Sequence, residues 1–293
     1  MSKRMRLERR LGWLLCAPAV GAMILVTAYP ILYALWLSLF RYDLRFPEKH
    51  RFVGLDNYLS VLTSEVWWKS VINTFIITVG SVSFELVIGF ALAHLMYRAT
   101  FGRFAVRTAV LVPYAIITVV AALAWKFAFD PTTGFVNALL GLDNSWLTQR
   151  WSAFFVIIFT EIWKTTPFMA LLLLAGLTQI PADLLKAARV DGASDWQRLR
   201  YITLPLMKSS ILVALLFRTL DAFRIFDTVY IQTRGAQNTE TVSMVGYNTL
   251  IVRLNLGMGS AVSVLIFCAV LIIVLIFVKG FGLTFQTTSE KSR

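Results

Sequence analysis

The sequence contains little cysteine and histidine, and it is short of acidic residues. Only two cysteines and two histidines occur among 293 residues, and 16 Asp and Glu stand against 28 Lys and Arg. Cys16 and Cys268 lie inside apolar segments, which predicts buried free thiols and not a disulfide. His50 and His94 are far apart in the chain and show no metal-ligand spacing. We therefore expect neither a disulfide framework nor a metal site.

Motifs for nucleotide binding and for catalysis are also missing. No G-x-x-x-x-G-K-S/T run occurs, so the chain lacks the loop that usually cradles ATP phosphates. No nucleophile–base arrangement is visible either, and no catalytic residue is predicted. We predict that this chain is not an enzyme and holds no cofactor, so the energy for its function must come from elsewhere.

Apolar residues dominate the composition. They make up 58% of the chain, with a mean hydropathy of +0.70, whereas about 45–50% is usual for soluble domains. The formal net charge of +12 is compatible with nucleic-acid binding, but the basic residues flank apolar runs, as in membrane proteins. We predict an all-α polytopic protein of the cell inner (plasma) membrane, surrounded by the lipid bilayer and without a nucleic-acid partner.

Runs of membrane-spanning length recur along the whole chain. A bilayer requires about 20 helical residues, and six segments approach this length. They are Leu11–Phe40, Val71–Tyr97, Phe104–Phe129, Ser152–Leu177, Leu206–Ile231 and Met258–Leu283. Basic residues before the first run are also typical of a cleavable signal, but that run is too long for a signal core. We interpret it as a retained anchor helix.

Lysine and arginine cluster on one side of the predicted spans. The clusters precede the first span, separate the second from the third and the fourth from the fifth, and follow the sixth. Because cytoplasmic loops carry the excess of basic residues, we expect cytoplasmic N- and C-termini. The opposite connection, Arg41–Lys69, is also basic, but its charge is diluted by Asp43, Glu48 and Asp56.

A polar stretch separates the fourth and fifth predicted spans. Ala182–Val190 is rich in helix formers, and Gly192 can supply a left-handed residue that ends such a helix. Ser194 and Gln197 have the spacing of a capping box that starts a second short helix. Pro205 suits the start of the next long helix. We predict a short helix, a tight turn and a second short helix at the membrane surface.

The same stretch carries a long, gapped motif, E-A-A-x-x-D-G-A followed by I-x-L-P. The matching residues are Ala187, Ala188, Asp191, Gly192, Ala193, Ile202, Leu204 and Pro205. This segment resembles the signature loop of ATP-binding-cassette importer permeases. Lys186 departs from the motif, because it occupies the place of the leading Glu. The alternative is an ordinary cytoplasmic loop whose helices are capped.

In that family the loop docks into a cleft on a cytoplasmic ATPase subunit. The resemblance implies that residues 181–205 form a cytoplasmic coupling loop through which ATP hydrolysis moves the permease. The coupling residues that it implies are Lys186, Ala187, Ala188, Asp191, Gly192, Ala193 and Pro205. Lysine at position 186 is compatible with a helix, but its charge is opposite to that of the motif Glu. A salt bridge that the Glu makes in the family is therefore not expected here.

The external loop 41–69 holds a second motif, Phe52-Val53-Gly54-Leu55-Asp56-Asn57-Tyr58. On its own it fits a turn followed by an amphipathic segment that ends at Trp67 and Trp68. It also resembles the F-x-G-L-x-N-Y element found after the first span of carbohydrate-importer permeases. The second resemblance narrows the family from importers in general to the sugar group.

Ionisable residues inside the fourth span are informative, because each costs about 2.5–3.5 kcal/mol at a helix centre. Glu161, Lys164, Thr165 and Phe168 are spaced i, i+3, i+4 and i+7, so they share one helical face. Pro167 lacks a backbone N–H, and we expect it to bend or open the helix.

The fifth span presents a second polar face. It consists of Arg218, Asp221, Ala222 and Ile225. The i, i+3 spacing of Arg218 and Asp221 permits mutual neutralisation, and Asp227 is expected on the opposite side. We predict a polar cavity near the bilayer middle, suited to sugars because they carry many hydroxyls and no net charge. Phe168 can supply an aromatic face. The alternative is that these charges only pair helices, or that the span ends before Arg224.

The family resemblance points to the same positions. Alignment through the signature loop to the larger permease of the maltose importer brings its sugar-contacting positions onto both faces. They fall on Lys164, Thr165, Phe168, Arg218, Asp221, Ala222 and Ile225. The side chains differ from that permease, so the resemblance implies a location and not a chemistry.

The resemblance extends over nearly the whole chain, and its nearest form is the first permease subunit of actinobacterial trehalose importers. The segments that carry it are 27–39, 107–114, 161–177, 214–227 and 259–267. It implies a type I ABC-importer permease fold in one transmembrane domain, 1–293, that imports trehalose or a related disaccharide. It also implies a second permease subunit, two ATPase copies that hold ATP and Mg²⁺, and an extracytoplasmic sugar-binding protein.

Two other classes compete with this interpretation. In an ion-coupled secondary sugar transporter, Glu85, Glu161 and Asp221 are candidate proton sites. However, the six spans show no evident inverted repeat, and the signature loop has no task in such a carrier. A non-transporting membrane scaffold leaves the charges on two helical faces as an unexplained cost. We therefore predict an ABC importer permease.

Overall fold

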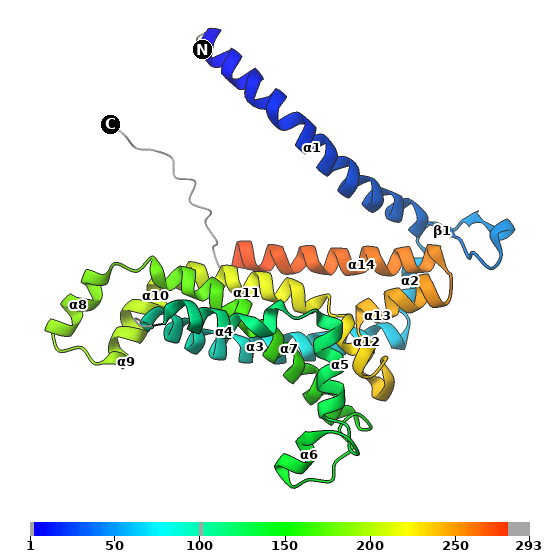
Figure 1. Cartoon of the computed structure of the whole chain (residues 1–293). Helices are drawn as coiled ribbons and strands as arrows, with labels where there is room; N and C mark the ends of the chain where they lie inside the picture. The colour runs from blue at the N-terminus through cyan, green and yellow to red at the C-terminus, as the bar shows by residue number, and fades with distance from the viewer. Residues whose placement is uncertain (1–2, 100–101, 281–293) are drawn as a thin grey trace. The chain divides into compact units, whose positions relative to one another are not determined.

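The computed structural model describes residues 3–99 and 102–280, and these are almost entirely helical (Figure 1). The long helices are α1 (Lys3–Ser38), α3 (Glu65–Arg98), α7 (Arg150–Thr178), α11 (Lys208–Phe223) and α14 (Leu256–Leu275). The shorter α-helices are α2 (Asp56–Leu62), α4 (Arg103–Ala115), α5 (Thr118–Ala128), α6 (Phe135–Leu140), α8 (Ala182–Val190), α9 (Asp195–Arg198), α10 (Leu204–Leu206), α12 (Asp227–Gln232) and α13 (Val242–Tyr247).

Minor elements complete the fold. Strands β1 (Phe40–Arg41) and β2 (Arg51–Phe52) pair antiparallel, with Phe40 opposite Phe52. The 3-10 turns are Pro47–Lys49 and Ala236–Asn238, and the π-helical turns are Leu199–Thr203, Asn248–Val252 and Ile276–Gly280.

Within residues 3–99 and 102–280, four helical segments are long and apolar enough to cross a membrane, and two bent helix pairs raise this number to as many as six. The predicted all-α polytopic fold is therefore confirmed for the described residues. Helices α1, α3 and α7 match the predicted first, second and fourth spans within about eight residues at each end. Helix α7 continues through Pro167, so the helix is not opened there. Residues 281–283 of the predicted sixth span lie outside the described residues.

The third predicted span, 104–129, is present as a bent pair of helices and not as one continuous helix. It consists of α4 and α5, whose axes differ by 87°. Ile116 and Ile117 are extended, with ψ of 136° and 135°. The break follows Pro113, and β-branched residues occupy 116–120. Such residues lose side-chain freedom in a helix, which favours the extended backbone here.

The fifth predicted span is interrupted too. The chain bends by 68° between the segments Asp195–Leu206 and Lys208–Gln232. Pro205 therefore lies in α10. We had expected it to begin the long helix, which instead begins at Lys208. At the other end α11 stops at Phe223, and a short break leads into α12. Ile225 consequently lies outside the helical face on which it was predicted.

The chain divides into two compact units. Unit 1 comprises Met1–Ser64 and Gly246–Phe267, and unit 2 comprises Glu65–Val245 and Cys268–Arg293. In unit 1 the side chain of Asn57 donates to the backbone oxygens of Ser38 and Phe40, both at 2.8 Å. A residue of the F-x-G-L-x-N-Y motif thus fixes the turn that follows α1.

Helix α1 is largely uncovered by the rest of its chain. None of its membrane-length apolar window is buried. Cys16 on α1 and Cys268 on α14 are both free and exposed. The prediction of free thiols is confirmed, but the prediction of burial was wrong. Both side chains lie on apolar helical faces that this chain does not cover by itself.

Unit 2 is organised around the packing of α3 against α7. Buried side chains from both helices form its main apolar core, including Val82, Met96, Met169 and Leu173. Small residues allow the backbones to approach: a Cβ on Gly89 would lie 2.8 Å from Cγ of Met169. Close approach of this kind is how helices pack where lipid surrounds them.

The connections at the two ends of α7 differ in character. The connection that precedes α7 contains α6 and a tight turn at Asp130, whose carboxylate accepts backbone and hydroxyl hydrogen bonds from Thr132 and Thr133. These bonds lower the pKa of Asp130 to about 2. The connection after α7 contains α8 and α9, which project from the helices of unit 2 (Figure 1).

The contact between α7 and α11 yields a prediction about stability. A Cβ on Gly176 would lie 2.6 Å from Cβ of Ser210, a distance that real Cβ atoms do not show. We expect Gly176→Leu to destabilise the protein by about 1–3 kcal/mol through overpacking. Thermal denaturation in detergent, followed by size-exclusion chromatography, measures the loss. Gly12→Leu is the control, since nothing lies within 4 Å of that position. Equal stability of the two variants would contradict the packing argument.

Candidate functional site

Two helix breaks of unit 2, at 116–117 and at 224–226, adjoin one cavity of about 440 Å³. Its walls come from α4, α5, α7, the end of α11, the break at 224–226 and the start of α12. The lining residues are Tyr114, Thr118, Glu161, Lys164, Thr165, Asp221, Arg224, Ile225, Phe226, Asp227 and Thr228. Irregular backbone at membrane depth is tolerated where it lines a cavity or is buried in protein, so the breaks and the cavity explain each other.

The cavity lining is strongly polar and carries both signs of charge. Lys164 and Arg224 are cationic, whereas Glu161, Asp221 and Asp227 are acidic. The Lys164 ammonium lies 5.4 Å from the centre of the Tyr114 ring, where the aromatic face attracts a cation. The hydroxyl of Thr228 donates to the carboxylate of Glu161. Donors and acceptors therefore surround the cavity, as recognition of a polar solute requires.

A buried ion pair between Arg218 and Glu85 adjoins the cavity through the lining residues Thr165 and Asp221. Arg218 and Glu85 are fully buried, with 1% and 0% of their side chains exposed. The Arg218 guanidinium donates to both Glu85 oxygens, from Nε at 2.6 Å and from Nη2 at 2.9 Å. Its Nη2 also donates to the hydroxyl of Thr165 at 2.9 Å, and its Nη1 donates to Asp221. Helices α3, α7 and α11 are thus joined by one hydrogen-bonded network.

The structure brings most of the predicted cavity residues together. Glu161, Lys164, Thr165, Asp221 and Ile225 all line the cavity. Arg218 and Ala222 are buried and lie outside the lining. Phe168 is not a lining residue either; it stacks on Tyr114 with ring centres 5.4 Å apart. The role of these residues in substrate passage stays a prediction.

Sequence reasoning missed several residues of this site. Asp227 was expected on the opposite side of the span, but the break after Phe223 returns it to the cavity. Tyr114 and Thr118 flank the break between α4 and α5, which we did not foresee. Glu85 was named only as a candidate proton site of the alternative carrier, and its pairing with Arg218 was not foreseen. The Pro113 position was the available signal for the first break.

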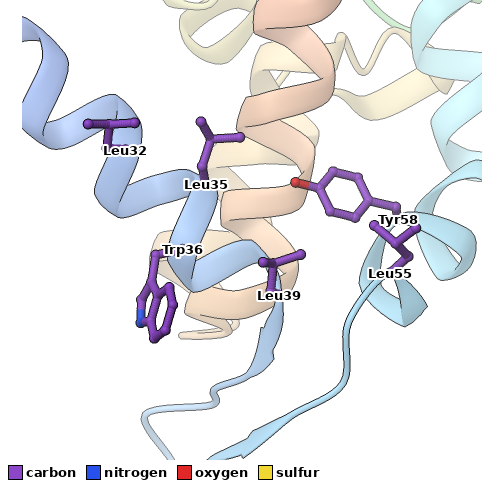
Figure 2. A pocket seen from close by; sticks show the side chains of 6 residues that line it. All are labelled: Leu32, Leu35, Trp36, Leu39, Leu55 and Tyr58. Atoms are coloured by element: carbon purple, nitrogen blue, oxygen red, sulfur yellow. The ribbon is translucent and has the colours of Figure 1, made fainter.

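Unit 1 contains a second cavity of different character, of about 390 Å³. Figure 2 shows side chains from α1 opposite Tyr58 of α2 and Leu55, the residue that precedes α2. The remaining lining residues are Leu32, Leu35, Trp36 and Leu39. The Tyr58 hydroxyl points toward α1 (Figure 2), where it lies 2.5 Å from the hydroxyl of Ser38. With its one hydroxyl already bonded, this groove offers little to a hydroxyl-rich solute.

The predicted architecture of the polar loop is confirmed. Helix α8 covers Ala182–Val190, and Gly192 has a φ of +81°. Ser194 and Gln197 form the expected capping box at the start of α9. Most of the coupling residues are exposed, with Ala188 and Ala193 half-buried. The unusual Lys186 forms an ion pair with Asp183 at 3.1 Å, so its charge is met within α8 itself.

Comparison with known proteins agrees with this arrangement. The family described as "binding-protein-dependent transport system inner membrane component" matches residues 85–281. The chain belongs to this family. It is therefore a multi-pass inner-membrane component of an ABC importer, and the family is one of transport proteins and not of enzymes.

Individual relatives match nearly the whole permease chain. The trehalose transport system permease protein SugA of Mycobacterium tuberculosis is 53% identical, with 94% of this chain and 90% of that protein covered. The trehalose/maltose transport system permease protein MalF of Thermococcus litoralis is 39% identical, with 93% and 94% covered. A bacterial alginate ABC transporter, crystallised with an alginate-pentasaccharide-bound periplasmic protein, is 25% identical with a TM-score of 0.78, covering 94% of this chain and 96% of that chain.

Membership of this family does not favour the ion-coupled carrier. The geometry agrees, because Glu85, one of its candidate proton sites, is fully buried in a bidentate pair with Arg218.

The buried pair generates a prediction about folding. Removing one partner leaves an uncompensated charge, so we expect Glu85→Leu or Arg218→Met alone to cost about 3–5 kcal/mol. The double variant should recover most of the loss, because both charges disappear together and Asp221 remains exposed to the cavity. The yield and thermal stability of the purified protein measure this double-mutant cycle. A double variant as unstable as the sum of the single changes would show that the two residues do not act as a pair.

Proposed function

We propose that this permease is one half of the translocation pathway of an ATP-driven importer of trehalose or a related disaccharide. The observation that carries the proposal is its similarity, over almost its entire length, to a trehalose transport permease. A second relative of comparable coverage is named for trehalose and maltose. Both substrates are neutral disaccharides.

The polar cavity supports a solute of this kind. Its volume of about 440 Å³ falls within the range of about 300–1,000 Å³ that small-molecule sites occupy. Its charged side chains form stronger hydrogen bonds to hydroxyls than neutral groups do. Three acidic and two basic residues line it, so the lining is close to balanced and favours neither an anion nor a cation strongly.

Within this proposal the two predicted faces have different tasks. Glu161, Lys164, Thr165, Asp221 and Ile225 line the route of the sugar. Arg218 and Ala222 lie outside the lining and hold the lining residues in position. Phe168 acts through Tyr114, whose ring it stacks against, and Tyr114 offers the aromatic surface to the sugar.

Residues 181–205 couple this movement to ATP hydrolysis. The proposal places α8, the turn at Gly192 and α9 against a cytoplasmic ATPase, which holds ATP and Mg²⁺. The exposure of this loop supports docking, and so do its exposed apolar side chains Val190 and Tyr201. The remaining partners are a second permease subunit, a second ATPase copy and an extracytoplasmic sugar-binding protein. Both chain termini are then cytoplasmic.

Uptake measurements test the substrate. In a strain that lacks the endogenous subunit, this chain should restore uptake of labelled trehalose. Asp227→Asn should raise the KM about tenfold or more, because hydrogen bonds to charged groups contribute about 1.5–3 kcal/mol. Asp143→Asn removes an exposed carboxylate outside the cavity and is the control. Restored uptake of an unrelated solute without trehalose uptake would refute the substrate.

A second experiment tests the coupling loop. Gly192 has a φ of +81° and open space around its missing Cβ, so Gly192→Val strains the turn without a clash. We expect trehalose uptake to fall at least tenfold while membrane insertion is kept, because the turn no longer holds α8 and α9 for docking. Gly141→Val is the matched control, since Gly141 is equally open with a φ of +65° but precedes α7. If both variants transport equally well, the loop has no coupling role.

A further inference from the structure

A separate cavity of about 490 Å³ lies between the end of α3 and the polar loop. One wall comes from α3, and the other comes from α8, α9 and the π-helical turn that follows. Its charged lining residues are Arg98, Asp195 and Arg198. Neither the polar transport cavity nor the exposed docking surface of the loop includes Arg98.

The charges around this cavity do not balance. Arg198 donates to one oxygen of Asp195, and Nη2 of Arg98 lies 3.9 Å from the other. Two guanidinium groups therefore share one carboxylate. No other lining residue carries an acid, so one positive charge is left for a ligand.

Two lining side chains also contain buried polar atoms with unmet hydrogen-bonding capacity. Nε of Arg198 and Nδ1 of His94 have no hydrogen-bond partner among residues 3–99 and 102–280. The guanidinium of arginine is always protonated, so its Nε is a donor and requires an acceptor. The hydrogen-bonding capacity of Arg198 is therefore not exhausted by its pair with Asp195.

The rest of the lining is apolar. Phe90, Leu185, Trp196 and Leu199 contribute ring and aliphatic surface to the same cavity. Arg98 is the last residue of α3, which is one of the membrane-length helices. Tryptophan and arginine at a span boundary are typical of the headgroup level of a bilayer. The cavity is thus cationic and apolar at once, at the depth where lipid phosphates lie.

We propose that this cavity binds the phosphodiester headgroup of an anionic phospholipid. The phosphate contacts Arg98 and Arg198, and the glycerol and first methylene groups pack against Phe90 and Trp196. A soluble phosphate ester would meet the charge but leave the apolar wall uncovered. An occupied cavity joins α3 to α9, so the lipid restrains the position of the polar loop. That the lipid belongs to the cytoplasmic leaflet rests on the orientation proposed above.

Native mass spectrometry tests the proposal on the full chain, extracted with its co-purifying partners. The probes are phosphatidylglycerol and, as a neutral comparison, phosphatidylethanolamine, each added at equal concentration. Wild type should retain phosphatidylglycerol in preference. Arg98→Gln should weaken retention about fivefold, as expected for one basic residue near an anionic lipid. Arg107→Gln, an exposed arginine on α4 outside the cavity, should retain lipid as wild type does.

A variant without any change of charge provides a second measurement. Ala91 also lines the cavity, and Ala91→Phe should fill it and lower phosphatidylglycerol retention while both arginines remain. Soluble glycerol phosphate in large excess should not displace the lipid. Equal retention of the two lipids, wild-type retention by Arg98→Gln and Ala91→Phe, or displacement by glycerol phosphate would each overturn the proposal.

Discussion

The bidentate pair between Arg218 and Glu85 is the interaction on which the packing of unit 2 depends. Charged groups are expensive inside an apolar helix bundle, and they persist there only when paired and hydrogen-bonded. Arg218 meets this condition with three partners from three helices: Glu85 on α3, Thr165 on α7 and Asp221 on α11. Asp221 is at the same time a wall of the polar cavity. The part of the cavity wall that Thr165 and Asp221 form therefore cannot move without breaking this buried network.

The helices around this buried pair are interrupted. The breaks at 116–117 and 224–226 both face the cavity, and each brings a residue to its lining that a straight helix would direct elsewhere. The buried pair and the helix breaks thus have different roles within unit 2. The pair holds the bundle together, while the breaks supply polar side chains, and room for a solute, at one depth.

Local patterns in the sequence were sufficient for much of this structure. The bounds of α8, the turn at Gly192 and the capping box at Ser194 followed from propensity and spacing, because local interactions determine them. Helical periodicity likewise placed Lys164 and Thr165 on the cavity face. The break at 116–117 was missed because hydropathy remains high through it, and a short run of β-branched residues outweighs it only locally. An end of the fifth span before Arg224 was considered only as the alternative interpretation. The partner of Arg218 lies 133 residues away, and no periodicity within one helix reports such a contact.

Helix α7 runs without interruption from the cavity to the polar loop, through Pro167. Thr165 lies thirteen residues before its end at Thr178, a distance of about 20 Å along the axis. A helix of this kind acts as a lever arm: a tilt of about 10° around its loop end displaces the cavity wall by ~3.5 Å. That displacement exceeds the donor–acceptor distance of a hydrogen bond, about 2.7–3.2 Å. A small rotation at the loop is therefore enough to break the hydrogen bonds that Thr165 makes to Glu85 and Arg218.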